Sequence, residues 1–280
     1  MISREPGRLQ NPAEPLRILL CTSGGLHGAR VMARLLADPR VQVVGVVFSS
    51  RVLGKRDGWL RGVWDLYRRS GLRYLLYLWT ASGLAERLAP LDSVEARARA
   101  ASIPLHLSRD INDPGGRAFV ERCKPQLLVS AFFNQRIAPG VLQLPSAGSV
   151  NIHPSLLPDL RGVDPVFFAR LRGMAPLGVT LHRVVEDLDA GPVLAQARVD
   201  VAASDSVLAI TARLFERGAD LLLDRLDAIL AGDPGVAQQG AGSYDSWPSS
   251  AQVARFHRAG GALVRATDLR CLFRRRSTRP

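Results

Sequence analysis

Short continuous apolar runs alternate with amphipathic stretches along most of this sequence. The runs at residues 16–21 and 41–48 are apolar at most positions, which is typical of strands buried on both faces of a parallel sheet. Between them, Thr22-Ser23-Gly24-Gly25 gives a turn signal, and residues 27–37 have helical periodicity. A strand, a glycine turn and a helix in this order predict the start of an α/β sheet.

The same alternation returns after residue 91. We predict strands over 104–107, 126–131, 149–153, 177–185 and 192–199, and helices over 92–101, 114–123, 164–172 and from a cap at 204–206 to about Ala231, before Gly/Ser/Gln-rich residues 232–246. The fold class is α/β: a Rossmann-like, mostly parallel sheet with helices on both faces, plus a short carboxyl-terminal helical extension. We expect a main domain over 14–200 with an insertion at 49–91, and a carboxyl-terminal helix and basic tail over 201–280.

The composition indicates a folded protein. Hydrophobic residues make up 47% and charged residues 22% of the chain, which are ordinary values for a globular protein. The first fifteen residues contain no apolar run, and no stretch of about 18 uninterrupted apolar residues follows, so neither a signal peptide nor a membrane span is indicated. Cys21, Cys123 and Cys271 lie too far apart in the sequence to indicate a disulfide framework or a zinc site. We expect a cytoplasmic protein with buried thiols.

The formal charge of +12 is concentrated in two segments. Residues 51–73 hold seven Lys/Arg against two Asp, and residues 255–280 hold eight Arg against one Asp, so these segments carry the whole excess. Between Trp64 and Trp79, arginines are interleaved with aromatic and aliphatic side chains, as in helices that lie at a membrane interface. An amphipathic helix packed on its own domain also explains this stretch and is the interpretation we favour.

Three polar residues are candidates for chemistry. Asn151 and His153 stand at the end of a predicted parallel strand, which Pro154 terminates. Their spacing of two residues places both side chains on one face, at the edge where ligands of α/β sheets bind. An amide and an imidazole there can both donate hydrogen bonds to an oxyanion. Asp189 lies in the loop 186–192, which can fold over the same edge, where a carboxylate would orient the imidazole and relay a proton.

Simpler interpretations of these residues stay open. Asn151 and His153 would also satisfy buried backbone groups, and Asp189 would also suit an ordinary turn. Ser155 is a possible nucleophile of a Ser-His-Asp hydrolase, but the Gly-x-Ser-x-Gly nucleophile elbow of such enzymes is absent around it. Residues 24–28 lack the dinucleotide-binding spacing, so no nicotinamide cofactor is expected. No metal is expected either, because the remaining histidines form no metal-ligand pattern and are assigned to core or surface positions: His27, His106, His182 and His257.

Longer motifs surround the candidate residues. They are Pro125-Gln126-Leu127-Leu128-Val129, Asn151-Ile152-His153-Pro154-Ser155-Leu156-Leu157-Pro158 with Arg161-Gly162, Gly178-Val179-Thr180-Leu181-His182, and Leu188-Asp189-Ala190-Gly191-Pro192. Together they resemble the folate-dependent formyltransferase family, which includes glycinamide ribonucleotide, methionyl-tRNA and sugar-nucleotide N-formyltransferases. The resemblance covers roughly residues 14–200, apart from the insertion at 49–91.

The resemblance implies a set of functional residues. In that family the asparagine, histidine and aspartate of these motifs are catalytic, which assigns catalysis to Asn151, His153 and Asp189. An uncharged amine would attack the formyl carbon of 10-formyltetrahydrofolate, with two residues holding the oxyanion while the aspartate orients the histidine and helps to remove the proton. The resemblance further assigns folate binding to Phe132, Phe133, Asn134 and Ile137 and to Val185, Glu186 and Asp187, and acceptor binding to the backbone amides of Ser23, Gly24 and Gly25.

The acceptor amine is left open by the sequence. We expect a primary amine of a small molecule, most simply an amino-sugar nucleotide or a hydroxylated amine, and the insertion disfavours glycinamide ribonucleotide. Methionyl-tRNA is the alternative, because tRNA formyltransferases also have a basic insertion after the second strand. Their carboxyl-terminal β-barrel of about a hundred residues does not fit into the 49 residues after Ala231, where we expect Tyr244–Pro248 to fold back beside the main domain. A non-catalytic module that binds nucleic acid or a membrane surface is the alternative of another class, and a homodimer is left open.

Overall fold

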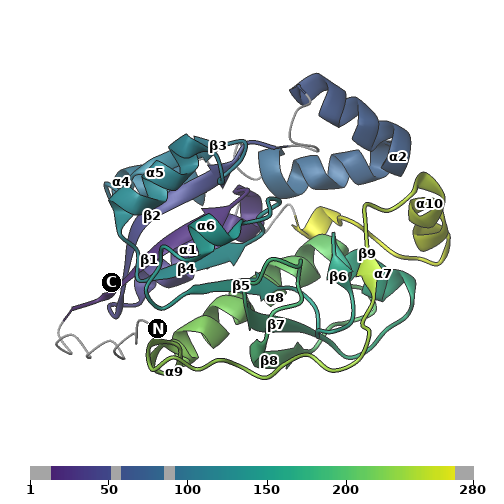
Figure 1. The fold of residues 1–280 in the computed structure, drawn as a ribbon. Coiled ribbons are helices and arrows are strands. Elements are labelled where there is room, and N and C mark those ends of the chain that lie inside the picture. Colours follow the sequence, from purple (N-terminus) through teal and green to yellow (C-terminus); the bar gives the residue numbers. More distant parts are fainter. Residues whose placement is uncertain (1–13, 52–57, 85–91, 269–280) are drawn as a thin grey trace, which may run out of the picture.

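The computed structural model describes residues 14–51, 58–84 and 92–268 (Figure 1). Its centre is a seven-stranded sheet with the strand order β3-β2-β1-β4-β5-β7-β8. The strands are β1 (Leu16–Thr22), β2 (Val41–Ser49), β3 (Leu105–Ser108), β4 (Leu127–Ala131), β5 (Ser149–His153), β7 (Leu177–Arg183) and β8 (Val193–Val199). Neighbouring strands from β3 to β5 are parallel, and β7 is antiparallel to both β5 and β8. The prediction of a mostly parallel α/β sheet is confirmed.

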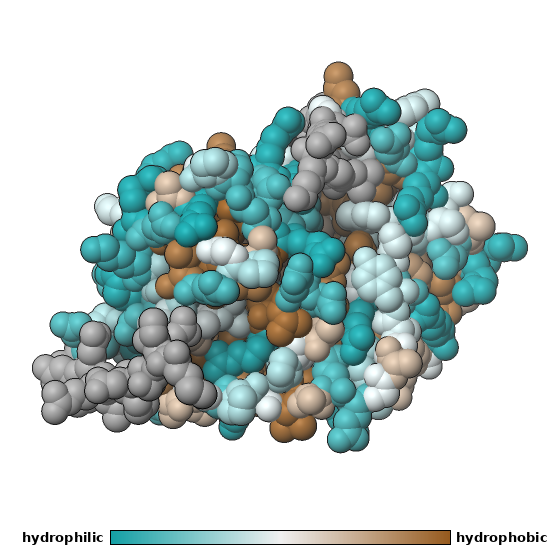
Figure 2. Space-filling view, in the orientation of Figure 1, coloured by the Kyte–Doolittle hydropathy of each residue, from teal (hydrophilic) through white to brown (hydrophobic). Residues whose placement is uncertain are grey.

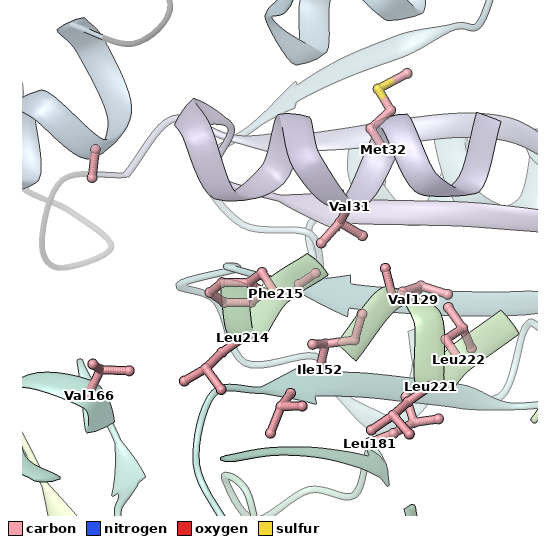
Figure 3. Packing of buried hydrophobic residues seen from close by; sticks show 14 of the residues in the cluster. Val31, Met32, Val129, Ile152, Val166, Leu181, Leu214, Phe215, Leu221 and Leu222 are labelled. Atoms are coloured by element: carbon pink, nitrogen blue, oxygen red, sulfur yellow. The ribbon is translucent and has the colours of Figure 1, made fainter. Parts of the chain in front are cut away.

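Helices cover both faces of the sheet. On one face lie α1 (Gly25–Ala37), α4 (Val94–Ala100) and α8 (Val207–Asp224), and on the other lie α5 (Pro114–Cys123) and α6 (Pro139–Leu142). A hydrophobic core lies on each face of the sheet, and successive side chains of β1 point into one core and then the other. Ile18 and Leu20 pack in the core with α1, whereas Leu19 and Cys21 pack in the core with α5. Figure 3 shows part of the first core, in which Val31 of α1 points toward side chains of α8 and of the sheet, among them Ile152 of β5.

The predicted helix that ends near Ala231 is two helices in the structure. α8 is followed by α9 (Leu226–Leu230), and the break falls at Arg225, where ψ is 4°. Neither glycine nor proline marks this position, so the local sequence does not signal the break. α8 packs directly on α1, β5, β7 and β8. The domain boundary near residue 200 stays a prediction, and in the structure it would separate α8 from the sheet that it covers.

The insertion folds as an amphipathic helix on its own domain, as the sequence analysis favoured. α2 (Trp59–Trp79) is kinked at Gly71, whose φ of 81° and ψ of 170° are not helical, and it runs into the π-helix η1 (Thr80–Leu84). Leu66, Ser70 and Tyr74 are buried, and Ser70 Oγ donates to Pro248 O at 2.7 Å. The tyrosine hydroxyl of residue 74 donates to Asp164 Oδ2 at 2.8 Å. The ring of Tyr74 also contacts that of Phe167, so this buried face links the insertion to α7 (Pro165–Leu171) and to the carboxyl-terminal segment.

The carboxyl-terminal segment folds back beside the main domain, as expected for Tyr244–Pro248. β9 (Tyr244–Asp245) pairs in parallel with β6 (Arg161–Gly162) in a small second sheet, and α10 (Ser250–Arg258) packs on α2 and α7. Figure 1 shows α10 beside α2, at the edge of the molecule where β6 and β9 lie. The segment is therefore part of the same packed unit as the sheet.

Two of the three cysteines lie within the described residues. Cys21 and Cys123 are free and buried, as expected, whereas Cys271 lies outside the described residues, as does the end of the basic tail after Asp268. No helix in the described part of the chain is both long enough and apolar enough to cross a membrane. Within the same residues, no group of three or more His, Cys, Asp or Glu is arranged to hold a metal ion.

His27 is a buried histidine in the first turn of α1. Its ring packs against the rings of Phe132 and Phe215, at centroid distances of 4.9 and 5.4 Å, and these two rings also contact each other. Neither ring nitrogen has a hydrogen-bond partner among the described residues. Burial, together with the positive charge of Arg30, lowers the pKa of His27 to about 3. The folded protein therefore keeps this ring neutral under conditions in which the unfolded chain protonates it.

We expect His27→Leu to stabilise the protein more at pH 5 than at pH 8, by about 2 kcal/mol. The folded-state pKa lies below the unfolded-state value, so the wild-type protein loses stability as the pH falls from about 6.5 toward about 3, and leucine removes this loss. Urea unfolding at the two pH values measures the difference. His106→Leu, at a half-buried position on β3, controls for the loss of a histidine. An equal effect of His27→Leu at both pH values would contradict the buried neutral ring.

Candidate active site

The three predicted catalytic residues meet at one edge of the sheet. β5 ends with Asn151 and His153, and antiparallel pairing with β7 sets Asn151 opposite His182. The loop between β7 and β8 then returns Asp189 to this edge, where its backbone adopts the left-handed region with φ of 54°. One strand pair and the loop that follows it therefore bring Asn151, His153 and Asp189 together.

The carboxylate of Asp189 is the centre of this cluster. Its Oδ2 accepts a hydrogen bond of 2.9 Å from the backbone N–H of Gly162. Its Oδ1 lies 3.4 Å from Asn151 Nδ2, 3.4 Å from His153 Nδ1 and 3.8 Å from His182 Nε2. These three distances exceed the range of about 2.7–3.2 Å for a good N–H···O bond. One carboxylate oxygen is thus anchored, while the other faces three nitrogens without being held tightly by any of them.

His153 is buried, and each of its ring nitrogens faces an acceptor. Nε2 lies 2.9 Å from the carbonyl oxygen of Leu160, a contact that assigns a proton to Nε2. Nδ1 faces the Asp189 carboxylate. With Nε2 protonated, Nδ1 carries a proton only in the imidazolium form, and that form has an acceptor on both sides. The Nδ1 edge of the ring is therefore the edge that can exchange a hydrogen bond or a proton at this site.

His182 belongs to the cluster, although the sequence analysis assigned it to an ordinary core or surface position. Its Nδ1 lies 2.8 Å from Arg183 O, and its Nε2 lies 3.0 Å from Asn151 Nδ2. Burial, reinforced by the neighbouring His153, lowers the pKa of His182 to about 4. The ring is then neutral near pH 7, with Nδ1 donating to the carbonyl and Nε2 accepting from the amide. His182 thereby fixes the orientation of the Asn151 side chain.

Gln238, after α9, holds the loop that carries Asp189. Its Nε2 donates to Asp189 O and to Gly191 O, each at 2.8 Å. Its Oε1 accepts from the guanidinium of Arg161 at 2.7 Å. Arg161 precedes Gly162, whose N–H anchors the carboxylate, so one amide connects the aspartate loop with β6. The sequence analysis included Gln238 only in a Gly/Ser/Gln-rich stretch and missed this role.

The two segments to which the resemblance assigns folate lie side by side. Arg136, within the segment 132–137, donates to Glu186 O at 2.8 Å and so bridges to the segment 185–187. Asn134 Oδ1 accepts from Ser49 Oγ at 2.6 Å, while Ile137 is buried in the core under α5. Among the other assigned residues, Phe132 and Phe133 are partly buried, and Val185, Glu186 and Asp187 are exposed. The exposed edge between the two segments adjoins Asp189.

The turn assigned to the acceptor is largely covered by protein. The Ser23 N–H donates to Phe132 O at 2.7 Å, and the Gly24 N–H donates to Thr22 Oγ1 at 3.2 Å. Gly25 has φ of 62°, and a Cβ at this position would lie 2.3 Å from Ala81 O of η1. Position 25 therefore requires glycine, because the backbone of the insertion at Ala81 leaves no room for a Cβ. In this arrangement two of the amides proposed to hold an acceptor already donate within the protein.

A cavity of about 200 Å³ lies next to the turn that follows His153. It is lined by the turn after β5, by α7 and by the start of β7, and its wall includes Ser155, Asp159 and Leu160. Asn151, His153 and Asp189 are not in its wall. Ser155 Oγ donates to Asp159 O at 2.9 Å, which is a structural contact within the turn. Ser155 therefore stabilises the turn that follows strand β5.

Comparisons with known proteins agree on one family. A model described as formyl transferase matches residues 96–226. A methionyl-tRNA formyltransferase of Roseiflexus sp. (strain RS-1) is 33% identical over 219 residues, which is 78% of this chain and 58% of that protein. One of Bacillus licheniformis is 40% identical over 109 residues, which is 39% of this chain and 34% of that protein. This chain thus spans little more than half the length of the first of these relatives.

Solved structures show the same fold. A sugar N-formyltransferase from Shewanella sp. has a TM-score of 0.54 at 17% identity, over 82% of this chain and 76% of that one. Glycinamide ribonucleotide transformylase 1 from Symbiobacterium toebii has a TM-score of 0.54 at 19% identity, over 85% of this chain and 100% of that one. At these identities the likeness concerns the fold alone. The architecture is therefore the α/β formyltransferase fold. Over residues 96–226 the chain is a domain of the formyl transferase family.

Proposed function

We propose that this protein transfers the formyl group of 10-formyltetrahydrofolate to a primary amine of a small molecule, an amino-sugar nucleotide or a hydroxylated amine. The observation that carries the proposal is the convergence of Asn151, His153 and Asp189 at one edge of a formyl transferase domain. A non-catalytic binding module would have no need of this convergence.

In the proposed reaction, the lone pair of the amine attacks the formyl carbon and the carbonyl becomes an oxyanion. The Asn151 amide and, in the imidazolium form of His153, its Nδ1–H would donate to this oxyanion, since both lie beside the weakly held Oδ1 of Asp189. Asp189 would take the proton of the attacking nitrogen, directly or through water. Collapse of the intermediate would then break the bond between the formyl carbon and N10, and that nitrogen would receive the proton. Products are the formamide and tetrahydrofolate.

The donor would lie along the exposed edge between the segments 132–137 and 185–187. Two observations support this placement. The hydrogen bond from Arg136 to Glu186 O keeps the two segments together. The apolar residues Val185 and Leu188 are 38% and 43% exposed. A flat, apolar pterin can cover such surface while its polar edge bonds to backbone groups. The formyl group would then reach the neighbouring residue, Asp189.

A small acceptor is favoured because part of the positive charge of the insertion is engaged in contacts within the protein. Arg69 donates to Trp247 O at 3.1 Å and to Ser246 Oγ at 3.2 Å, so part of the basic insertion fastens the carboxyl-terminal segment. The rival acceptor is methionyl-tRNA, which is favoured by the names of the relatives from Roseiflexus and Bacillus. Contacts with many phosphates would make formylation of a tRNA steeply dependent on salt, whereas a small amine would show a weaker dependence.

A direct assay distinguishes these acceptors. The full chain is incubated with 10-formyltetrahydrofolate and, in separate reactions, with methionyl-tRNA, amino-sugar nucleotides and hydroxylated amines, and tetrahydrofolate release is followed. Formylation of a small amine is the expected result. Salt-sensitive formylation of the tRNA alone would replace the proposed acceptor by the rival. If no acceptor is formylated under conditions in which a known formyltransferase is active, the proposed reaction itself is wrong.

We expect Gln238→Ala to lower turnover about tenfold, with little change in KM for the folate, because it releases the loop that positions Asp189. Gln196→Ala is the matched control. Gln196 also makes two hydrogen bonds, to Leu157 O and Thr180 Oγ1, but it does not touch the aspartate loop. Steady-state kinetics and thermal unfolding of both variants check the expectation. Equal losses of turnover in the two variants would mean that the loss comes from disturbed packing in general and not from the position of Asp189.

A further inference from the structure

The helix α2 exposes large apolar side chains on the side opposite its buried face. Leu66, Tyr74 and Tyr77 are at most 4% exposed and pack against the domain. Six other apolar residues of the same helix are exposed: Leu60 (74%), Trp64 (57%), Tyr67 (43%), Leu72 (57%), Leu76 (50%) and Trp79 (44%). In the space-filling view, a small hydrophobic area projects at the top, in the region where Figure 1 places α2, and the surface around it is mostly polar (Figure 2). The inner face of the helix is therefore packed on the domain, whereas these six side chains remain exposed among the described residues.

These exposed residues follow a pattern that occurs twice. Leu60, Trp64 and Tyr67 have the spacing i, i+4, i+7, which places them on one face of a helix. After the kink at Gly71, residues 72, 76 and 79 repeat this spacing. An arginine follows the leading leucine in each copy, and a tyrosine or tryptophan closes each copy. Two short helical arms thus present the same arrangement of one leucine, one further apolar residue and one terminal aromatic ring.

Positive charge accompanies both apolar stripes. The segment 59–79 contains four arginines, Arg61, Arg68, Arg69 and Arg73, against the single acid Asp65, which gives it a net charge of +3. All four arginines are exposed. Exposed aromatic rings, aliphatic side chains and arginines close together on a helix are the combination that binds at the boundary between lipid headgroups and acyl chains.

We propose that α2 docks this protein onto an anionic lipid bilayer, with the two apolar stripes inserted at the level of the headgroups. The proposal goes beyond the formyl transfer proposed above and does not depend on it. The chain would lie on the membrane, because no described helix is able to span it. Docking through α2 leaves the buried face on α7 and α10 undisturbed.

Two other partners fit the same surface less well. A second copy of the chain in a twofold dimer would place the arginines of one α2 against those of the other, which is unfavourable. An RNA would bind the arginines and stack on the aromatic rings, but it would offer no apolar partner to Leu60, Leu72 and Leu76. A lipid surface accommodates the leucines, the aromatic rings and the positive charge together.

The test is co-sedimentation of the full chain with vesicles of phosphatidylcholine alone and of phosphatidylcholine mixed with phosphatidylglycerol. We expect the partition coefficient to be about 100-fold higher for the anionic vesicles, as three net positive charges near an anionic surface predict, and to fall as salt is added. Equal partition into neutral and anionic vesicles, or no binding to either, would overturn the proposal.

Variants of exposed residues locate the contact without disturbing the core. Trp64→Ser combined with Trp79→Ser is expected to lower the partition coefficient about tenfold or more. Leu107→Ser combined with Leu230→Ser removes comparably exposed side chains from β3 and α9 and should change nothing. Circular dichroism checks that both variants fold. Sedimentation velocity and binding to a tRNA are measured on the same samples. If the tryptophan variant instead abolishes a dimer or tRNA binding while vesicle binding persists, α2 does not dock to lipid.

Discussion

Alanine at His153 or at Asp189 is expected to lower formyl transfer by about two to four orders of magnitude while the protein stays folded. The two residues act on each other, because His153 Nδ1 faces the carboxylate at 3.4 Å. Loss of the carboxylate removes the proton acceptor and the group that orients the ring. Loss of the ring removes a hydrogen-bond donor to the oxyanion and the contact of Nε2 with Leu160 O. Single-turnover release of tetrahydrofolate measures both effects.

Asp187 supplies the matched control for Asp189. It lies two residues earlier in the same loop, it is exposed, and it is outside the matched motif that begins at Leu188. Asp187 belongs to the segment assigned to folate, so Asp187→Ala is expected to act on KM for the folate, whereas turnover should stay within about tenfold of wild type and circular dichroism should show all three variants folded. An essential Asp187 with a dispensable Asp189 would mean that the loop has been assigned wrongly. Near-normal transfer by both principal variants would remove the basis of the proposed mechanism.

The sequence predicted those features of the site that depend on local pattern. Apolar runs defined the strands, and the spacing of Asn151 and His153 with a following proline placed both at a strand end. The loop of Asp189 carried glycine and proline as turn signals, and the resemblance singled out its aspartate. Each of these inferences uses residues close together in the chain, for which hydrophobic periodicity and turn chemistry are informative.

The features that the sequence did not predict depend on contacts between distant residues. His182 lies beside Asn151 only because β7 pairs with β5 in the antiparallel sense, and a single sequence does not specify that register. Gln238 reaches Asp189 across 49 residues of chain, from a segment without regular periodicity. A buried polar side chain is recognisable in a sequence as an exception to the apolar pattern. The residue to which it hydrogen-bonds is not recognisable, because it can lie anywhere else in the chain.

Asn151→Ala is expected to lower kcat about 100- to 1,000-fold and to weaken folate binding by less than about tenfold. The amide would act on the oxyanion, which exists only after attack on the formyl carbon, so its loss is felt mainly in the transition state. One N–H of this amide already donates to His182 at 3.0 Å, and the other faces Asp189 Oδ1 at 3.4 Å. The second N–H is the one that would turn to the oxyanion. Steady-state kinetics and calorimetric titration with tetrahydrofolate separate the two effects.

The contact with His182 makes a double-mutant cycle the decisive form of this experiment. If His182 only positions Asn151, His182→Phe should reduce kcat in the wild-type background and have almost no further effect in Asn151→Ala, because the group that it positions is already gone. His182→Gln, which offers an amide oxygen to Asn151 Nδ2, should recover part of the lost turnover. Additive losses in the cycle would instead mean that His182 contributes to the reaction independently of Asn151. In that case the neutral imidazole of His182, whose pKa burial lowers to about 4, would act in the reaction itself rather than only support the amide.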